Sequence, residues 1–382
     1  RKANSSYIES GYGYGMYDTK KRSIDLGFNS GSTELGLSVN SNKTDGYKIR
    51  TDSDIKRGYE NLTTNFHIGQ AFQNSDITLR HWRTSGTVEY LDFFLTAIDQ
   101  DFINESSAIE INNNFKNKIQ NKVIISSVKD DIKQNQSTAY VYSKRNIFDG
   151  QISKLAGSHN ITGGLYLSDE EASSFAWGSG YNKDTQSNAI FIQDQINEGN
   201  HRIFIAARLS DHETFGKETT WNAEYGLSIS DQWSINASAG HAFRAPDATD
   251  RYGYGGNINL KPEASDDIQL NVAFRRDDNT TYRLELFDTK IENLIEYDFA
   301  KDQMLNIGQA SMRGLQLSYH LINENYSIRA DYINQKAEND INKTLLLRRP
   351  KQSFTLNISK KLKNFDFGLS LLASGERKDF GV

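Results

Sequence analysis

Residues 34–39 read Glu-Leu-Gly-Leu-Ser-Val, and residues 365–371 read Phe-Asp-Phe-Gly-Leu-Ser-Leu. Both stretches alternate apolar residues with polar or small ones. Successive side chains of a β-strand point to opposite faces, so this alternation gives each strand one apolar and one polar face. The same pattern recurs at residues 23–28, 233–237, 282–286 and 354–358. The alternation predicts an all-β protein.

The polar set of these strands decides which kind of β protein is expected. It contains Asp25, Ser38, Asn236, Arg283, Glu285, Thr355, Asn357 and Asp366. A small soluble barrel or sandwich fills its inner face with apolar side chains. A soluble sheet with one wet face needs helices or a second sheet to cover the other, and no sustained helical period is present. The polar set therefore favours a large antiparallel transmembrane β-barrel with a wet or plugged interior.

Composition agrees with this interpretation and narrows the function. The 382 residues carry a net charge of -5 and no cysteine. We expect no nucleic-acid partner, because the chain has no excess of basic residues. We also expect no disulfide and no thiolate metal site, because there is no cysteine. Mean hydropathy is -0.66. A low value suits a transmembrane barrel, since only every second residue faces lipid.

Turn signals divide the chain into crossings of unequal connection length. Short turns such as residues 29–32 and 362–364 join paired strands. Longer polar segments, which we expect to face the cell exterior, separate the pairs. They lie at residues 42–60, 83–105, 168–187 and 243–265. At about ten residues per crossing, we expect roughly 18 to 20 strands.

Aromatic residues are abundant and suggest two roles. Membrane barrels carry aromatic girdles at both interfaces, and we assign one group to them. That group is Tyr7, Tyr90, Trp82, Tyr297 and Tyr319. Three others fall in long connections and are candidates for ligand contact: Trp177, Tyr252 and Tyr254.

Catalytic motifs are not evident. The seven histidines are scattered without an H-E-x-x-H pattern, and no serine stands in G-x-S-x-G. A lipase or protease of the outer membrane needs such a constellation within its barrel. We therefore expect a transporter and not an enzyme.

Four ordered motifs carry a family resemblance. They are residues 241–247 (HAFRAPD), 252–263 (YGYGGNINLKPE), 287–295 (FDTKIENLI) and 306–315 (NIGQASMRGL). Their order and spacing resemble those of TonB-dependent outer-membrane receptors. The resemblance implies a barrel of the 22-stranded type, in the bacterial outer membrane, in contact with its lipid. It also implies active import of a scarce nutrient.

The resemblance assigns residues 1–382 to the barrel domain alone. Members of this family carry a plug before the barrel and end on closing strands, and neither is expected within this sequence. The partner protein TonB would act through the plug. We expect a monomer, because these receptors are single-chain barrels.

Within the family, the likeness is to receptors for cobalamin (vitamin B12), mainly through residues 346–352 (LLRRPKQ). It places Arg348, Thr138 and Phe380 at ligand-contacting positions, with Phe380 standing where the family has tyrosine. Cobalamin or a related corrinoid is thus the expected ligand. The alternatives are a siderophore or haem receptor of the same family and a passive porin.

The same likeness implies calcium in the outer loops. Asp52, Asp54 and Glu89 match calcium ligands, and the match of either Asp99 or Asp101 depends on the placement of one gap. Calcium takes six to eight oxygen ligands, often from adjacent loops. Lys48 stands where the family has another aspartate and disfavours the ion, so a solvated acidic loop is the alternative. No covalent cofactor is expected.

Overall fold

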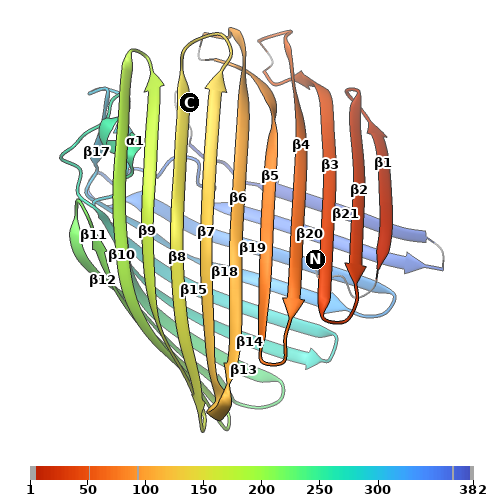
Figure 1. Ribbon diagram of the computed structural model, residues 1–382. Helices are drawn as coiled ribbons and strands as arrows, with labels where there is room; N and C mark the ends of the chain where they lie inside the picture. Colours follow the sequence, from red (N-terminus) through yellow and green to blue (C-terminus); the bar gives the residue numbers. More distant parts are fainter. Residues whose placement is uncertain (1–5, 51, 93, 364, 379–382) are drawn as a thin grey trace.

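The strands of the sheet follow one another in chain order. The computed structural model describes residues 6–50, 52–92, 94–363 and 365–378. Within these residues, each strand of the large sheet pairs antiparallel with the next, from β1 to β21. The two end strands, β1 and β21, are not paired with each other. The strands curve into a barrel wall (Figure 1). Alternation predicted this all-β meander, and the 19 strands of the sheet fall within the expected range.

The strands have the following bounds. The first group is β1 (Tyr7–Gly15), β2 (Thr19–Asn29), β3 (Thr33–Lys48), β4 (Lys56–Ala71), β5 (Ser75–Leu91), β6 (Ala97–Phe115), β7 (Ile119–Gln134), β8 (Tyr140–Ala156), β9 (His159–Ala176) and β10 (Ser179–Glu198). The second is β11 (His201–His212), β12 (Gly216–Ser228), β13 (Trp233–Arg244), β14 (Glu263–Asp277), β15 (Thr280–Glu292), β18 (Gln309–Ile322), β19 (Tyr326–Asn339), β20 (Gln352–Leu362) and β21 (Phe365–Ser374).

Register separates the two faces of the wall. One row runs through Asn236, Asn271, Glu285 and Gln316 on successive strands, and all four are polar. Because side chains alternate, the rows on either side of it face the opposite way. A continuous polar row is expensive in lipid, so this face borders the interior.

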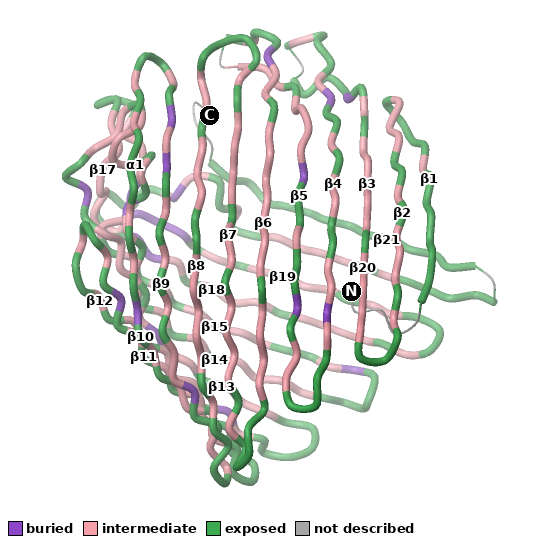
Figure 2. The backbone as a smooth tube through the Cα atoms, viewed as in Figure 1, coloured by how far each residue is buried: buried purple, intermediate pink, exposed green. Residues whose placement is uncertain are grey.

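The opposite face carries an apolar belt. Leu79, Ile109, Ile125, Phe148 and Leu167 stand directly opposite one another from β5 to β9. Large apolar side chains on this face remain exposed, as expected for contact with hydrocarbon. Buried residues are few and scattered along the tube in place of a central core (Figure 2).

An aromatic row marks the end of the wall with the short turns. Trp233, Phe274, Tyr282 and Tyr319 are register neighbours, with consecutive ring centroids 4.6, 6.1 and 5.1 Å apart. Such a row is the girdle expected at a membrane interface. The prediction for Tyr319 is confirmed.

The other girdle assignments are wrong. Trp82 stands opposite Asn65 and Ser106, in a polar row. Tyr7 and Tyr90 have the same inward parity on their strands, and Tyr297 lies in a separate hairpin. A tyrosine or tryptophan fits either side of a barrel, so only its parity on the strand decides which side it faces.

Outer connections are shorter than the polar segments of the sequence. The four segments narrow to connections at residues 49–55, 92–96, 177–178 and 245–262. The boundaries predicted for these four connections were wrong. The hydrogen bonds between strands use backbone groups only, so a polar residue can pair as well as an apolar one. Polar side chains can therefore continue a strand beyond the membrane.

Two outer connections fold into structure of their own. Residues 245–262 contain the short helix α1 (Ala248–Tyr252). Residues 293–308 contain a hairpin of β16 (Ile295–Asp298) and β17 (Gln303–Asn306). A second short helix, η1 (Lys116–Lys118), makes a turn between β6 and β7. Among the described residues, no helix is long and apolar enough to cross a bilayer.

Candidate functional site

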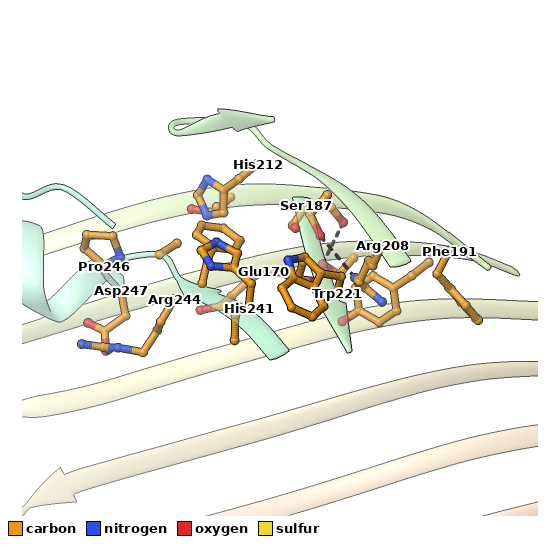
Figure 3. A pocket seen from close by; sticks show the side chains of 18 of the residues that line it. Glu170, Ser187, Phe191, Arg208, His212, Trp221, His241, Arg244, Pro246 and Asp247 are labelled. Atoms are coloured by element: carbon orange, nitrogen blue, oxygen red, sulfur yellow. Dashed lines mark hydrogen bonds between the residues drawn. The ribbon is translucent and has the colours of Figure 1, made fainter. Parts of the chain in front are cut away.

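A cavity of about 870 Å³ opens at the outer end of the wall. Strands β8 to β14 form its walls, and the segment around α1 forms its roof. Its volume lies within the range of small-molecule sites, about 300–1,000 Å³. Figure 3 shows its side chains, from Arg244, Pro246 and Asp247 at one end to Arg208 and Phe191 at the other.

Helix α1 is fixed by its own capping residues. Asp247 precedes the helix, and its carboxylate accepts a hydrogen bond from the Asp250 N–H at 2.8 Å. The Asp250 carboxylate in turn accepts from the Asp247 N–H at 3.2 Å. This reciprocal pair satisfies two backbone donors that a helix start leaves unpaired. The roof thus has a defined conformation despite its short helix.

Arg251 connects the roof to a neighbouring hairpin. Its guanidinium carbon lies 5.1 Å from the Phe215 ring centre and 4.8 Å from that of Tyr252. One of its terminal nitrogens donates to the Thr214 hydroxyl at 3.3 Å. Cation–π contacts of this kind contribute about 0.5–2 kcal/mol each. They place a positive charge over the cavity, and among the described residues this guanidinium forms no ion pair with a carboxylate.

Strand β10 holds the roof from another side. The Lys183 ammonium lies 4.8 Å from the Tyr252 ring centre. The hydroxyls of Tyr181 and Thr249 are hydrogen-bonded at 2.8 Å. Residues from β10, the β11–β12 connection and α1 therefore meet above the cavity.

Titratable groups of the roof have shifted pKa values. Burial, followed by the charge of Asp247, raises the pKa of Asp250. Burial, followed by the charge of Arg251, lowers the pKa of His212 at the outer end of β11. The His212 imidazole is therefore neutral at pH 7, and the positive charge of the roof comes from arginine and lysine.

The wall holds a second arginine that faces a ring. The guanidinium carbon of Arg208 lies 4.8 Å from the Tyr166 ring centre, and its Nε donates to the Ser210 hydroxyl at 3.2 Å. Within the described residues, neither Arg208 nor Arg251 makes an ion pair with a carboxylate. By contrast, Arg145 pairs with Glu170 at 2.6 Å and Arg244 with Glu263 at 2.5 Å. The cavity thus has two guanidinium groups without a carboxylate partner.

The ligand residues expected from the sequence lie elsewhere. Arg348 is in the connection between β19 and β20, where its N–H donates to the Lys378 carbonyl oxygen at 2.8 Å. Thr138 is exposed in the connection between β7 and β8. Neither is among the described residues that line the cavity. Phe380 lies outside the described residues. These assignments stay predictions.

The four acids expected to bind calcium are brought together only in part. Glu89 and Asp99 stand directly opposite each other on β5 and β6. Glu89 accepts from the Gly58 N–H at 3.0 Å, and Asp99 accepts from the Gln136 amide at 2.7 Å. In the described part of the chain, no three acidic, histidine or cysteine side chains are placed to hold a metal ion.

The other two acids already have basic partners in their own connection. Asp52 accepts two hydrogen bonds from Arg50, both at 2.8 Å, and these lower the pKa of Asp52. Asp54 forms an ion pair with Lys48, the cation that the sequence had marked as unfavourable to calcium. Calcium binding at these loops stays a prediction.

Sequence reasoning missed most residues of the cavity, although one signal was present. All seven residues of the HAFRAPD motif, residues 241–247, line it. So does Tyr252, which had been a candidate for ligand contact. Trp177, from the same group, is 75% exposed in a tight turn. Arg208 and Tyr166 belong to alternating strands and carried no signal of their own.

The wall and its cavity define a class of protein, a membrane barrel with a cavity at its outer end. Residues 3–381 match the family model described as "TonB dependent receptor-like, beta-barrel". The chain therefore belongs to the TonB-dependent receptor β-barrel family, and it is an outer-membrane protein. This is a family of receptors and transporters and not of enzymes.

Solved structures share the fold at low sequence identity. The ferric-catecholate import receptor Fiu from E. coli K12 matches with a TM-score of 0.80 and 11% identity, over 98% of this chain and 72% of that one. The alcaligin outer-membrane receptor FauA from Bordetella pertussis gives 0.78 and 14%, over 99% and 70%. The copper transporter OprC gives 0.77 and 12%, over 96% and 67%. At such identities the likeness speaks for the fold alone.

Proposed function

We propose that this receptor imports an anionic metal chelate by TonB-dependent transport and that the outer cavity binds the chelate first. The observation that carries the proposal is the pair Arg208 and Arg251. Each guanidinium is held against an aromatic ring and keeps donors for a ligand. Arginine in such a setting recognises carboxylates and other planar oxygen anions. One named structural neighbour is a ferric-catecholate import receptor, and its ligand belongs to the class proposed here.

Cobalamin is the second candidate and rests on the resemblance of residues 346–352. Arg348, the residue that the resemblance singles out, lies outside the cavity lining. No contact in the described residues favours a corrinoid over a smaller chelate. Cobalamin import is therefore a prediction from the sequence alone.

Calorimetry on the full-length receptor separates the two ligands. The probes are iron(III) tris-catecholate, which is a trianion, and cobalamin. We expect the trianion to bind, and we expect Arg208→Gln and Arg251→Gln each to weaken it by about tenfold or more. Arg251→Lys keeps the charge and should recover part of the loss. Binding of cobalamin without binding of the trianion would show the proposal to be wrong.

A matched control comes from another arginine of the wall. Arg329 pairs with Asp331 at 2.9 Å and does not line the cavity. Arg329→Gln should leave the affinity for the trianion unchanged. If it weakened binding as much as Arg208→Gln, the effect would be one of overall charge, and the cavity would not be the site.

A further inference from the structure

Two tyrosines from different outer connections meet at one carboxylate. Tyr254 belongs to the roof segment, residues 245–262, and Tyr297 lies on β16. Both hydroxyls donate to Asp302, in the turn of the β16–β17 hairpin. Each phenol uses a different oxygen of that carboxylate, and the bond from Tyr254 is 2.9 Å long. Three side chains with oxygen ligands therefore converge outside the wall.

The shared carboxylate has no basic partner. In the described part of the chain, Asp302 forms no ion pair with a lysine or an arginine. The neighbouring Lys301 lies 3.7 Å from Asp298 instead. Hydrogen bonds from the two phenols lower the pKa of Asp302, so its side chain is ionised at pH 7. A cation that binds here gains charge attraction without displacing a basic side chain.

Backbone contacts hold the two connections in place around this group. The Met304 N–H donates to the Gly255 carbonyl oxygen at 2.7 Å, and the Met304 carbonyl oxygen accepts from the Asn257 amide at 3.0 Å. Gly255 has a φ of 65°, and a Cβ there would lie 2.6 Å from the Tyr297 ring. Any side chain at this position would push the ring away. The three side chains are thus positioned before a ligand arrives.

The spacing of the oxygens suits an octahedral metal ion. When ligand oxygens lie about 2.0 Å from such an ion, neighbouring oxygens are about 2.8 Å apart. The oxygens of Tyr254 and Asp302 are 2.9 Å apart. Tyr297 also lines a cavity of about 580 Å³ between the hairpin and the connection 340–351. That space can admit the water or chelator oxygens that complete the coordination.

The charge of the group favours a trivalent ion over a divalent one. The Asp302 carboxylate raises the pKa of both phenols, so only a strongly polarising ion displaces their protons at pH 7. Such an ion reverses the effect, because it neutralises the carboxylate and binds the phenol oxygens directly. Two phenolates and one carboxylate then carry three negative charges, which match a trication.

We propose that Tyr254, Tyr297 and Asp302 bind ferric iron directly, at a site separate from the outer cavity. Three Fe–O bonds form, the two phenol O–H bonds break, and two protons pass to solvent, so the iron stays ferric. None of the three residues lines the outer cavity. The site therefore holds iron that reaches the receptor surface without the chelate that the cavity binds.

Titration of the full-length receptor in detergent with iron(III) nitrilotriacetate tests this site. Phenolate bound to ferric iron gives a charge-transfer band in the visible, which contacts of the chelate with arginine do not give. We expect this band in the wild type, and we expect Tyr254→Phe, Tyr297→Phe and Asp302→Asn each to weaken iron binding by at least about tenfold. No band in the wild type, or a full band in the Tyr254→Phe/Tyr297→Phe double variant, would overturn the proposal.

Two controls separate the site from more general effects. Asp298→Asn removes a carboxylate from the same hairpin, and Tyr12→Phe removes a phenol that is 69% exposed on β1. Both should leave the band unchanged. If Asp298→Asn weakened iron binding as much as Asp302→Asn, the charge of the hairpin as a whole would hold the iron, and the site would be refuted.

The arginine variants keep this proposal apart from the chelate proposal. Arg208→Gln and Arg251→Gln should leave the iron band unchanged, and Tyr297→Phe should leave the affinity for the tris-catecholate trianion unchanged. A band that disappeared with Arg208→Gln would assign the iron to the outer cavity and refute the tyrosine site. Failure of the trianion to bind, with the band intact, would contradict the chelate proposal alone.

Discussion

The two parts of the barrel wall build their outer ends differently. Strands β3 to β10 have 16 to 20 residues, and the turn between β9 and β10 is only residues 177–178. Strands β11 to β15 and β18 to β21 have 10 to 15 residues. Their outer ends carry the two folded connections, 245–262 and 293–308, and the irregular connection 340–351. Figure 1 shows α1 and β17 at the left edge of the tall strands.

Different interactions stabilise the two parts. The long strands continue the backbone ladder, which accepts almost any side chain. The outer connections depend on particular residues, such as Leu346, which packs in a small apolar cluster with Ala310 of β18 and Ala337 of β19. The cavity lies where the two parts meet, so the tall strands give it rigid walls and the connections give it a roof. The comparison teaches that the cavity takes its walls from one part of the molecule and its roof from the other.

Glycine substitutions should show the largest difference between the two parts. Gly46, in the bulge between β3 and β4, has a φ of 68°, and an added Cβ would meet the backbone carbonyl of Arg57. Gly308 has a φ of 89°, but its Cβ would meet only the side chain of Ile341. We expect Gly46→Ala to cost about 3 kcal/mol and Gly308→Ala about 1–2 kcal/mol.

Urea unfolding in detergent, followed by tryptophan fluorescence, measures both costs. Gly31→Ala is the control for backbone strain alone, because Gly31 has a φ of 76° and nothing within 4 Å of its Cβ. An equal loss for Gly46→Ala and Gly31→Ala would mean that the close approach of β3 and β4 contributes nothing.

Asn306 should give the next largest effect, confined to the folded connections. Its amide donates to the carbonyl oxygens of Lys261 at 3.0 Å and Asn293 at 2.6 Å, and its oxygen accepts from the Lys261 N–H at 2.9 Å. Asn306→Ala removes all three bonds, so we expect hydrogen exchange in residues 253–262 to become about tenfold faster. Thr63→Val removes one side-chain bond in the tall strands, to Thr84 at 2.9 Å, and should leave exchange there unchanged. Uniform loosening of both parts would contradict the comparison.

Tyr297 should give the smallest effect, which is visible only in strong base. A hydrogen bond to Asp302 raises the pKa of Tyr297 to about 12. The Tyr254 hydroxyl donates to the same carboxylate at 2.9 Å, so Asp302 also joins the hairpin to the roof segment. Because the folded pKa lies above the unfolded value, this stabilisation is complete below pH 10 and is lost as pH rises through about 12.

Ultraviolet titration of tyrosinate absorbance measures that pKa. The difference between the wild type and Tyr297→Phe should show one phenol that ionises near pH 12. Asp302→Asn should bring that ionisation down toward pH 10, because the carboxylate holds the proton in place. A Tyr297 phenol that titrates at 10 in the wild type would mean that the Asp302 carboxylate does not hold its proton within the β16–β17 hairpin.

The sequence predicted the sheet more fully than the site. Alternation at residues 34–39 and 282–286 appears in the register as polar and apolar rows. The number of strands followed from chain length and spacing. The strand ends could not be predicted in this way, because strands that pair beyond the membrane do not need alternating polar and apolar side chains. Arg348 was chosen by resemblance, whereas Arg208 stood in an ordinary alternating strand.

The sequence alone determined three things about this protein: the two-residue alternation of its strands, its polar interior and its membership of a receptor family. These properties are local, since every residue of a strand contributes its own face. Which charges share a cavity was decided only by the tertiary structure. Arg208 and Arg251 are far apart in the chain, and they line one cavity because the register of six ladders, from β8 to β14, and the curvature of the wall add up. The folding of two outer connections likewise brought Tyr254 and Tyr297 to one carboxylate.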